Sequence, residues 1–232
     1  MLLAQGNIKE DGHLQISRPA PPPLTRARRL LPLLALAPFA ACAPAPETAL
    51  PPPPAALPAM AWDGQAAQDD QWTEATLDAL EGEGAVLLSS VPHDIETWCP
   101  GYVQADPRER AAFWSGLLSA LARFESTWNP HAVGGGGQWF GLVQIAPATA
   151  RAYGCDATTG QALTDGAENL ECAVRIAART VLRDGVVAAG GGGFAADWGP
   201  FASASKRAEM ADWVSGQEYC QRSAAPAPGD EA

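Results

Sequence analysis

ESTWNPHAV at residues 125–133 and GLVQIAPATA at residues 141–150 are the two stretches that decide the fold of this chain. The first follows a segment from Arg108 to Phe124 whose apolar residues recur at helical spacing after an Asp-Pro start. Pro130 disfavours continuation of this helix. Glu125 is therefore expected where the strongest predicted helix of the chain ends.

Glu125 has the surroundings that a general acid needs. The C-terminus of a helix carries partial negative charge, and apolar neighbours such as Trp128, Trp139 and Phe140 would remove water from the carboxylate. Both effects raise its pKa, and a glutamate that stays protonated near neutral pH can protonate a glycosidic oxygen. A lone glutamate at a helix end is usually a solvated surface residue, so its role depends on the motifs around it.

The two stretches together closely resemble the soluble lytic transglycosylase (SLT) domain, which has a lysozyme-like fold. The family pattern is Glu-Ser, an aromatic residue and Asn-Pro, then Gly-Leu-Met-Gln-Ile and Pro-x-Thr-Ala, and Val143 stands here in place of the methionine. Residues 167–173 resemble the Asn-Leu helix start that packs behind the cleft in this family. The resemblance covers about residues 87–220 and implies a mainly α, lysozyme-like domain.

The resemblance also implies roles for individual residues. Glu125 would donate a proton to the bridging oxygen and then act as a base, Ser126 would help to hold the substrate, and Gln144 would hydrogen-bond sugar groups. Trp128 and Trp139 are expected beside Glu125 as sugar-binding aromatic residues. Two alternatives stay open: Gln144 can pair with backbone groups instead, and Ser126 can bond to free carbonyls of its own helix.

One motif of the family is missing. Its late Ala-Tyr-Asn-Ala-Gly sequence, whose tyrosine borders the catalytic glutamate, is replaced by GFAADWGPF at residues 193–201. Trp198 or Phe201 is expected to stand in as the aromatic wall of the site, and Asp197 could add a second carboxylate. The alternative is that Trp198 fills the core, as large aromatic residues usually do.

The resemblance implies an enzyme without a cofactor that cleaves the β-1,4 bond between N-acetylmuramic acid and N-acetylglucosamine in peptidoglycan, leaving a 1,6-anhydro end. A hydrolysing muramidase is the nearest alternative, with Asp197, Asp156 or Asp165 activating water. A non-catalytic peptidoglycan-binding module and an interaction domain without glycan contact are the others. The intact Glu125-Ser126 pair favours an enzyme.

The remaining helices are predicted from apolar periodicity and capping residues. They are expected over Pro147–Tyr153, Ala167–Asp184 and Ala204–Val214, with an outlying helix over Trp72–Leu80 and a short strand over Val86–Leu88.

Composition excludes several classes of function. The chain has 232 residues, 47% hydrophobic and 18% charged, which is enough for one packed domain with tails. A net charge of −11 argues against binding to a nucleic-acid backbone. Its three histidines lack the spacing of a zinc site, and its two glycine runs lack the Gly-Lys-Ser/Thr of a phosphate-binding loop.

The N-terminal region is typical of an exported lipoprotein. Three arginines within residues 26–29 precede an apolar run, and Phe39-Ala40-Ala41-Cys42 resembles a bacterial lipobox. Cys42 is therefore expected to become the lipidated N-terminus of a periplasmic protein tethered to the outer membrane. Ordinary cleavage at Ala41-Cys42-Ala43, without a lipid, is the alternative.

The predicted organisation has four parts: a targeting segment at residues 1–42, a Pro/Ala-rich linker with a possible short helix at 43–84, the catalytic domain at 85–222 and a disordered tail at 223–232.

An even number of cysteines after Cys42 in an exported chain predicts two disulfides, with free buried thiols as the alternative. The expected pairs are Cys155 with Cys172, around a short loop, and Cys99 with Cys220, joining the entry segment to the stretch after the last helix.

Overall fold

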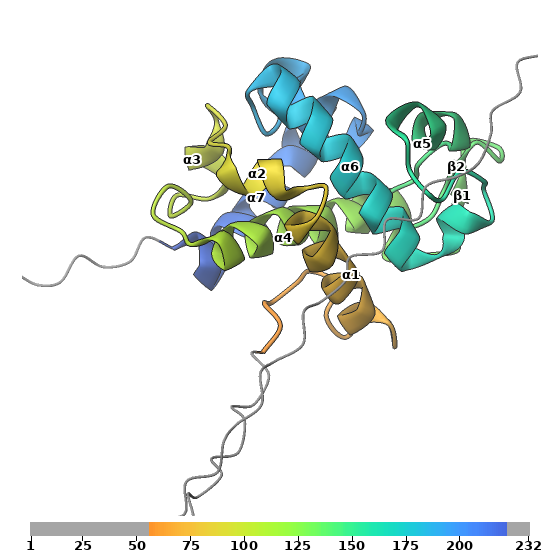
Figure 1. Ribbon diagram of the computed structural model, residues 1–232, viewed down its shortest axis with the longest axis horizontal. Helices are drawn as coiled ribbons and strands as arrows, with labels where there is room; N and C mark the ends of the chain where they lie inside the picture. The colour runs from red at the N-terminus through yellow and green to blue at the C-terminus, as the bar shows by residue number, and fades with distance from the viewer. Residues whose placement is uncertain (1–55, 222–232) are drawn as a thin grey trace, which may run out of the picture. The chain divides into compact units, whose positions relative to one another are not determined.

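A computed structural model describes residues 56–221 of the chain (Figure 1). The predicted targeting segment with Cys42 and the tail at 223–232 lie outside these residues. Within the described part, no helix is long and apolar enough to cross a membrane. The elements in chain order are α1 (Asp69–Glu81), α2 (Ala85–Ser89), α3 (Ile95–Trp98), α4 (Pro107–Ser126), β1 (Val133–Gly134), β2 (Trp139–Phe140), α5 (Pro147–Tyr153), η1 (Ala162–Thr164), α6 (Gly166–Asp184), η2 (Ala189–Gly191), η3 (Gly193–Ala196), η4 (Gly199–Ala202), α7 (Ala204–Ser215) and η5 (Glu218–Cys220), where η denotes a 3-10 helix.

The fold is mainly α, as predicted, and is built around α4. The helix begins with a capping box, in which the Asp106 side chain accepts from the backbone N–H groups of Arg108 and Glu109 while the Glu109 carboxylate accepts from the N–H of Asp106. Every side chain from Ala111 to Ala122 is buried, which is typical of a helix covered on all sides. Helices α1 and α7 pack against it.

The second long helix, α6, lies against α1 (Figure 1). Its buried residues follow the apolar stripe predicted from the sequence. Its start is capped by Asp165, whose carboxylate accepts from Ala167 and Glu168. Leu170, Ala173 and Val181 are buried on the α1 and core side. Helix α6 is therefore held as a rigid support behind the segment that contains GLVQIAPATA.

The N-terminal part of the described chain belongs to the core, although residues up to 84 are predicted as a linker. Trp62 and Trp72 are both buried, their rings meet edge to face with 5.9 Å between centroids, and Trp62 Nε1 donates to Thr73 Oγ1 at 2.9 Å. The short strand predicted over Val86–Leu88 is wrong, because these residues form α2. Only Leu87 of this helix is buried, so it shows neither the alternation of a strand nor a long apolar stripe.

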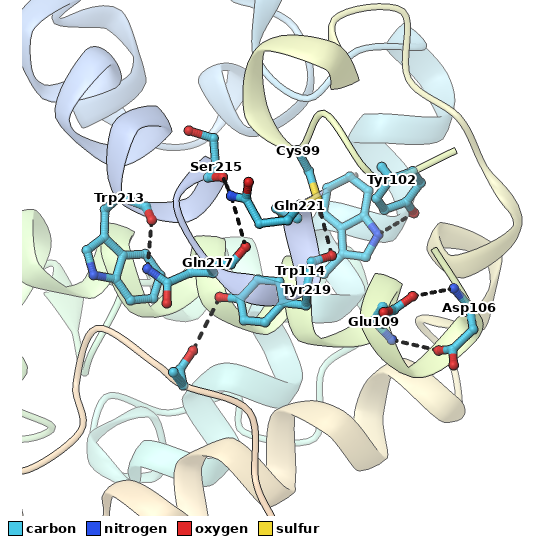
Figure 2. The surroundings of a disulfide bond; sticks show 12 residues. Cys99, Tyr102, Asp106, Glu109, Trp114, Trp213, Ser215, Gln217, Tyr219 and Gln221 are labelled. Carbon is cyan, nitrogen blue, oxygen red and sulfur yellow. Dashed lines mark hydrogen bonds between the residues drawn. A yellow bond between two sulfur atoms is a disulfide. The ribbon is translucent and has the colours of Figure 1, made fainter. Parts of the chain in front are cut away.

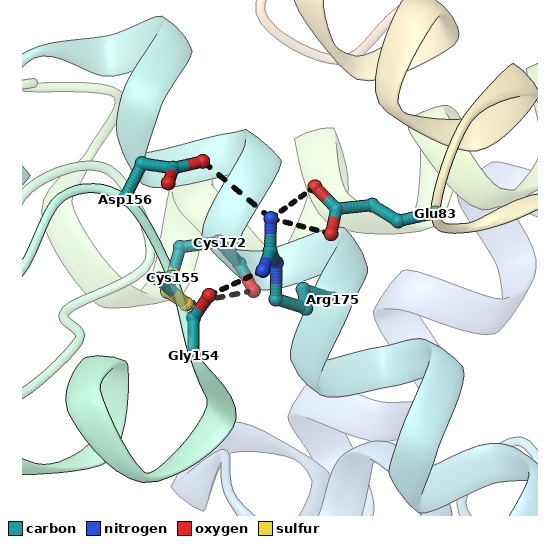
Figure 3. A network of polar contacts seen from close by, with 6 residues as sticks. All are labelled: Glu83, Gly154, Cys155, Asp156, Cys172 and Arg175. Carbon is teal, nitrogen blue, oxygen red and sulfur yellow. Dashed lines mark hydrogen bonds and ion pairs between the residues drawn. A yellow bond between two sulfur atoms is a disulfide. The ribbon is translucent and has the colours of Figure 1, made fainter. Parts of the chain in front are cut away.

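Two disulfides close the domain, in the pairing expected from the sequence. Cys99 pairs with Cys220 across a separation of 121 residues (Figure 2), and Cys155 with Cys172 across 17 (Figure 3). The chain-entropy model assigns about 5 kcal/mol of stabilisation to a loop as long as the first and about 3 kcal/mol to the second.

Arg175 on α6 forms a polar junction beside the Cys155–Cys172 disulfide (Figure 3). Its guanidinium donates to the Gly154 carbonyl, pairs with Glu83 at 2.6 Å and reaches Asp156 at 3.5 Å. The junction joins the segment before α2 to the loop after α5, so three parts of the chain meet at one side chain.

Candidate active site

Glu125 lies in the last turn of α4, and the chain reverses direction immediately after it. Thr127 and Trp128 both adopt left-handed backbone conformations, with φ of 52° and 57°. Thr127 N–H donates to Arg123 O at 3.1 Å, which closes the end of the helix. Two successive non-glycine residues in this region are strained, threonine especially because of its branched Cβ, and such strain is common at functional sites. The reversal leads the chain from the glutamate into β1.

Burial gives Glu125 the protonation behaviour of a general acid. The side chain is half-buried, and loss of solvent raises the pKa of its carboxyl from 4.5 to about 7, although the positive charge of Lys206 on α7 acts in the opposite direction. Within residues 56–221 no group hydrogen-bonds to this carboxylate. The carboxyl is therefore neutral for a large fraction of the time at pH 7, and its proton is not committed to another protein atom.

The two residues that follow Glu125 in the motif have their polar groups bound to α4. Ser126 Oγ donates to Ala122 O at 3.2 Å, which is the local bond left open as an alternative to substrate binding. Trp128 Nε1 donates to Ser119 O at 3.0 Å, so its ring lies along α4. The half-buried Trp128 ring borders a small pocket between α4 and α7, together with Phe124.

The side-chain oxygen of Gln144, Oε1, has no hydrogen-bond partner among residues 56–221. The backbone of Gln144 has φ of 52°, and its side-chain Nε2 donates to Ala132 O at 3.2 Å and Gly141 O at 2.9 Å. Both N–H groups of the amide are therefore bonded to backbone carbonyls, which was the alternative to sugar binding. Oε1 lies over Gly134, so close that a Cβ there would be 2.2 Å away. The half-buried residue can thus accept a hydrogen bond from a ligand but has no N–H left to donate.

Asn169 supports the Gln144 segment from behind. Its buried amide accepts from Val143 N–H at 3.0 Å and donates to Phe140 O and Leu163 O, each at 3.0 Å. Gly141, at φ of 84°, leaves the space that this contact needs, since a Cβ would lie 2.3 Å from Asn169 Nδ2. The Asn-Leu helix start therefore positions the first glycine of GLVQIAPATA.

Trp139 is the exposed aromatic residue of the β1–β2 hairpin. The strands pair antiparallel with Gly134 opposite Trp139, and the indole lies over Gly135, where a Cβ would be 2.3 Å from the ring. With 46% of its surface exposed, Trp139 has a ring face available for stacking. The first glycine run thus forms a hairpin that carries an indole close to Gln144.

Trp198 does not form an exposed aromatic wall, which corrects one expectation. It is 4% exposed, its Nε1 donates to Val143 O at 2.9 Å, and its ring packs 5.2 Å from that of Phe194. Phe201 is fully buried as well. The indole needs a polar partner when buried, and the Val143 carbonyl supplies it. Trp198 therefore stabilises the Gln144 segment from the core.

The aspartates considered as second carboxylates have other partners. Asp197 accepts a hydrogen bond from Tyr153 Oη at 3.2 Å. Partial burial of its carboxyl raises its pKa, and the charge of Asp184 adds to this, while the Tyr153 hydrogen bond and the charge of Arg183 act in the opposite direction. Asp156 faces Arg175, and Asp165 caps α6.

Sequence reasoning missed Lys206, because it lies on α7, 81 residues after Glu125 in the chain. Its Nζ is 5.6 Å from the centre of the Phe124 ring, next to the glutamate in the chain. No motif signals this residue, so only the folded arrangement reveals it. The structure thus supplies one carboxyl of raised pKa with a nearby cation at the end of α4, and one amide oxygen close to an exposed indole in the segment that follows. Groups of these kinds suit acid catalysis on a neutral polyhydroxylated ligand.

Comparisons with known proteins agree with the geometry. Residues 104–189 match the family model described as "Transglycosylase SLT domain". Three solved structures of DslA are similar over 72% of this chain and 100% of theirs: two glutamate-to-glutamine mutants, at 27% and 26% identity with TM-scores of 0.66 and 0.64, and wild-type form 2, at 27% with 0.65. No curated protein matches the chain. Residues 104–189 are thus similar to a transglycosylase SLT domain, and the chain shares the fold of the DslA structures.

Proposed function

We propose that this protein is a peptidoglycan lytic transglycosylase, which cleaves the β-1,4 bond between N-acetylmuramic acid and N-acetylglucosamine and leaves a 1,6-anhydro end. The SLT domain supports peptidoglycan as the substrate class. The observation that carries the proposal is the half-buried Glu125 carboxyl, with a pKa of about 7 and no hydrogen-bond partner among residues 56–221. A binding module would have no use for a carboxyl that is costly to bury and free to donate its proton.

In the first step, Glu125 donates its proton to the bridging oxygen while the bond from that oxygen to the muramic acid C1 breaks. Positive charge develops at C1, and the N-acetyl group of the substrate can stabilise it without a second protein carboxylate. Gln144 Oε1 would accept a hydrogen bond from a sugar O–H or an acetamido N–H, and Trp139 would stack on a ring.

In the second step, the 6-hydroxyl of the same muramic acid attacks C1, and its proton passes to the Glu125 carboxylate. A new C1–O6 bond replaces the bond that was broken, so no water is consumed and Glu125 returns to its protonated form. A pKa of about 7 suits both proton transfers, because Glu125 must donate a proton in the first step and accept one in the second.

The expected location follows from the N-terminal sequence. Arginines, an apolar run and the lipobox-like residues before Cys42 support export to the periplasm and a lipid anchor in the outer membrane. The Pro/Ala-rich residues after Cys42 would serve as an extended tether that lets the domain reach the cell wall. Cys42→Ala should release the protein into the soluble periplasmic fraction, and unchanged fractionation would exclude the anchor.

Incubation of the purified protein with peptidoglycan sacculi tests the activity. Glu125→Gln keeps the size of the side chain but removes the acidic proton, so solubilisation should fall by about 10²-fold to 10⁴-fold or more. Glu171→Gln is the matched control, because Glu171 lies on α6, outside the Glu125 site, and its carboxyl also has a raised pKa through partial burial and neighbouring acids. Undiminished activity of a folded Glu125→Gln variant would contradict the proposal.

A further inference from the structure

A pocket of about 140 Å³ lies between α4, α7 and the segment before α1. Its walls include the rings of Phe124, Trp128 and Trp213, with Ala61 on one side and the Arg123–Glu209 ion pair at the surface. Ala61 and α7 both lie outside the residues that match the SLT family model. Four of the eight lining residues therefore come from parts of this chain that the family model does not describe.

Hydrogen bonds hold the Trp128 ring and the backbone of Trp213 at the pocket. Trp128 is fixed by its bond to Ser119 O, and the Trp213 carbonyl accepts from Gln217 Nε2 at 2.8 Å (Figure 2). The Trp213 indole packs against α4 near Gly116, where an added Cβ would lie 3.5 Å from it, an ordinary van der Waals distance. Rigid walls reduce the entropy lost on binding.

The pocket lies beside the turn of α4 that carries Glu125. Phe124 precedes Glu125 in the last turn of α4 and contributes one wall of the pocket. Lys206 of α7 lies over the same Phe124 ring, 5.6 Å from its centre, and its charge acts on Glu125. A chain-like ligand that occupies the site at Glu125 would therefore pass close to the pocket.

The chemistry of the pocket fits a neutral ring with one apolar face. Half-buried indoles offer flat apolar surfaces, while the two charges at the rim neutralise each other and supply both N–H donors and carboxylate acceptors. Its volume is below the several hundred Å³ of a site for a whole small molecule, so it can hold only one unit of a larger ligand. Pyranose rings have C–H groups on their faces and hydroxyls at their edges.

We infer that this pocket is an auxiliary binding site for one N-acetylated sugar ring of the glycan strand, next to the ring pair cleaved at Glu125. The inference rests on the proposed function, which makes the glycan strand the ligand. A strand held at two places would stay oriented over Glu125 during the reaction, which lowers the entropic cost of each cleavage.

The probe is chitohexaose, a neutral N-acetylglucosamine oligomer, titrated into the full chain that carries Glu125→Gln to prevent turnover. Addition of Trp213→Ala should weaken chitohexaose binding by about three-fold to ten-fold, the effect of one lost stacking contact. Trp213→Phe should restore most of the affinity. Leu182→Ala is the control, because Leu182 is 48% exposed on α6 and lies outside this pocket, and it should leave binding unchanged.

A second measurement needs no change in the pocket, in case Trp213→Ala unfolds the chain. In the Glu125→Gln protein, chitohexaose should shift the NMR signal of the Trp213 indole N–H, assigned with Trp213→Phe. An unmoved Trp213 signal, or unchanged affinity in folded Trp213→Ala, would overturn the inference. A shift caused by a free muramyl peptide but not by chitohexaose would overturn the choice of a sugar ring.

The two proposals fail in different ways. If Glu125→Gln abolishes sacculus cleavage while Trp213 does not respond to chitohexaose, the auxiliary site is wrong and the enzymatic function stands. If Trp213 responds but Glu125→Gln cleaves sacculi normally, the pocket binds glycan and the role of Glu125 is wrong.

Discussion

The backbone N–H of Ala61 donates a hydrogen bond of 2.9 Å to Ser119 Oγ, and this bond ties the segment before α1 to the helix that carries Glu125. Ser119 Oγ in turn donates to Gly116 O at 2.7 Å. One helical turn earlier, the Ser115 hydroxyl is equally buried but has no hydrogen-bond partner among the described residues. Of these two buried serines on α4, only Ser119 has hydrogen-bond partners among the described residues.

Ser119→Ala should destabilise the domain by about 1–2 kcal/mol, because it leaves the half-buried Ala61 N–H without its partner. Ser115→Ala removes a hydroxyl that is already unpaired, so its effect should be near zero or stabilising. Urea unfolding of both variants measures the difference in free energy. Equal losses would show that the Ala61–Ser119 bond contributes nothing specific.

The start of the domain could not be predicted from the sequence for a physical reason. Residues 56–68 contain no helix or strand with an apolar period. The Pro/Ala-rich sequence that leads into them resembles a linker. Their burial comes from long-range contacts, such as Trp62 with Trp72 and Tyr219 Oη with Ala59 O at 3.3 Å (Figure 2). Local composition carries no information about such partners.

Helices α4, α5, α6 and α7 were predictable to within a few residues, because capping residues and apolar spacing are local signals. The same holds for the position of Glu125 at the end of α4. Lys206 and the buried state of Trp198 were not predictable, because each depends on which distant segment packs beside it. The motif residues of the site lie close together in the sequence, so local patterns reveal them. The groups that set their pKa and their position come from distant parts of the chain.

The activity should depend on pH through Glu125. Its neutral form is the active acid, so kcat/KM should fall by about ten-fold per pH unit above an apparent pKa of about 7. Lys206→Met removes the charge that lowers this pKa, so the alkaline limb should move to higher pH. Lys206→Arg keeps the charge and should leave the limb in place. An unmoved limb in Lys206→Met, measured on soluble glycan, would contradict this coupling.

Glu125 should also lower the stability of the folded domain at pH values where its carboxyl is ionised. Folding raises the pKa of the Glu125 carboxyl, so the folded state binds its proton more tightly than the unfolded state does. The free energy of unfolding is therefore unaffected below pH 4.5 and decreases as pH rises from 4.5 through 7. Because the carboxyl is partly exposed, solvent screening reduces the full penalty to an estimated ~1–2 kcal/mol. Glu125→Gln should therefore be more stable than the wild type at pH 8 and equal to it at pH 4. Thermal melts at both pH values test this, and a gain independent of pH would contradict it.

The glycine before the hairpin tip should be needed for the Gln144 amide. In Gly134→Ala the new Cβ would lie 2.2 Å from Gln144 Oε1, so the amide must move and lose its free acceptor position. Loss of one hydrogen bond to the substrate should raise KM by about ten-fold with little effect on folding. Gly136→Ala is the control, since its Cβ meets no atom within 4 Å and only its φ of +66° is strained. Equal KM values in the two variants would exclude this role for Oε1.

Asp197 decides between the transglycosylase and the hydrolysing muramidase. Water attack on the opposite face of the ring requires a second carboxylate about 6.5–9.5 Å from the acid. Asp197 is the acid nearest the replaced late motif, but its carboxylate accepts from Tyr153 Oη and lies near the charge of Arg183. These contacts give it a role in holding α5 against η3, and we expect it to take no part in catalysis.

Asp197→Asn should therefore preserve cleavage of sacculi and leave the product unchanged. The amide can still accept the Tyr153 hydrogen bond, so the fold is kept while any base activity is lost. Mass spectrometry of the released muropeptides should find anhydro ends, about 18 Da lighter than reducing ends because no water is added. Reducing ends in the wild type that disappear in Asp197→Asn would establish water as the nucleophile and Asp197 as its base. The 6-hydroxyl route, which needs only Glu125, would then be wrong.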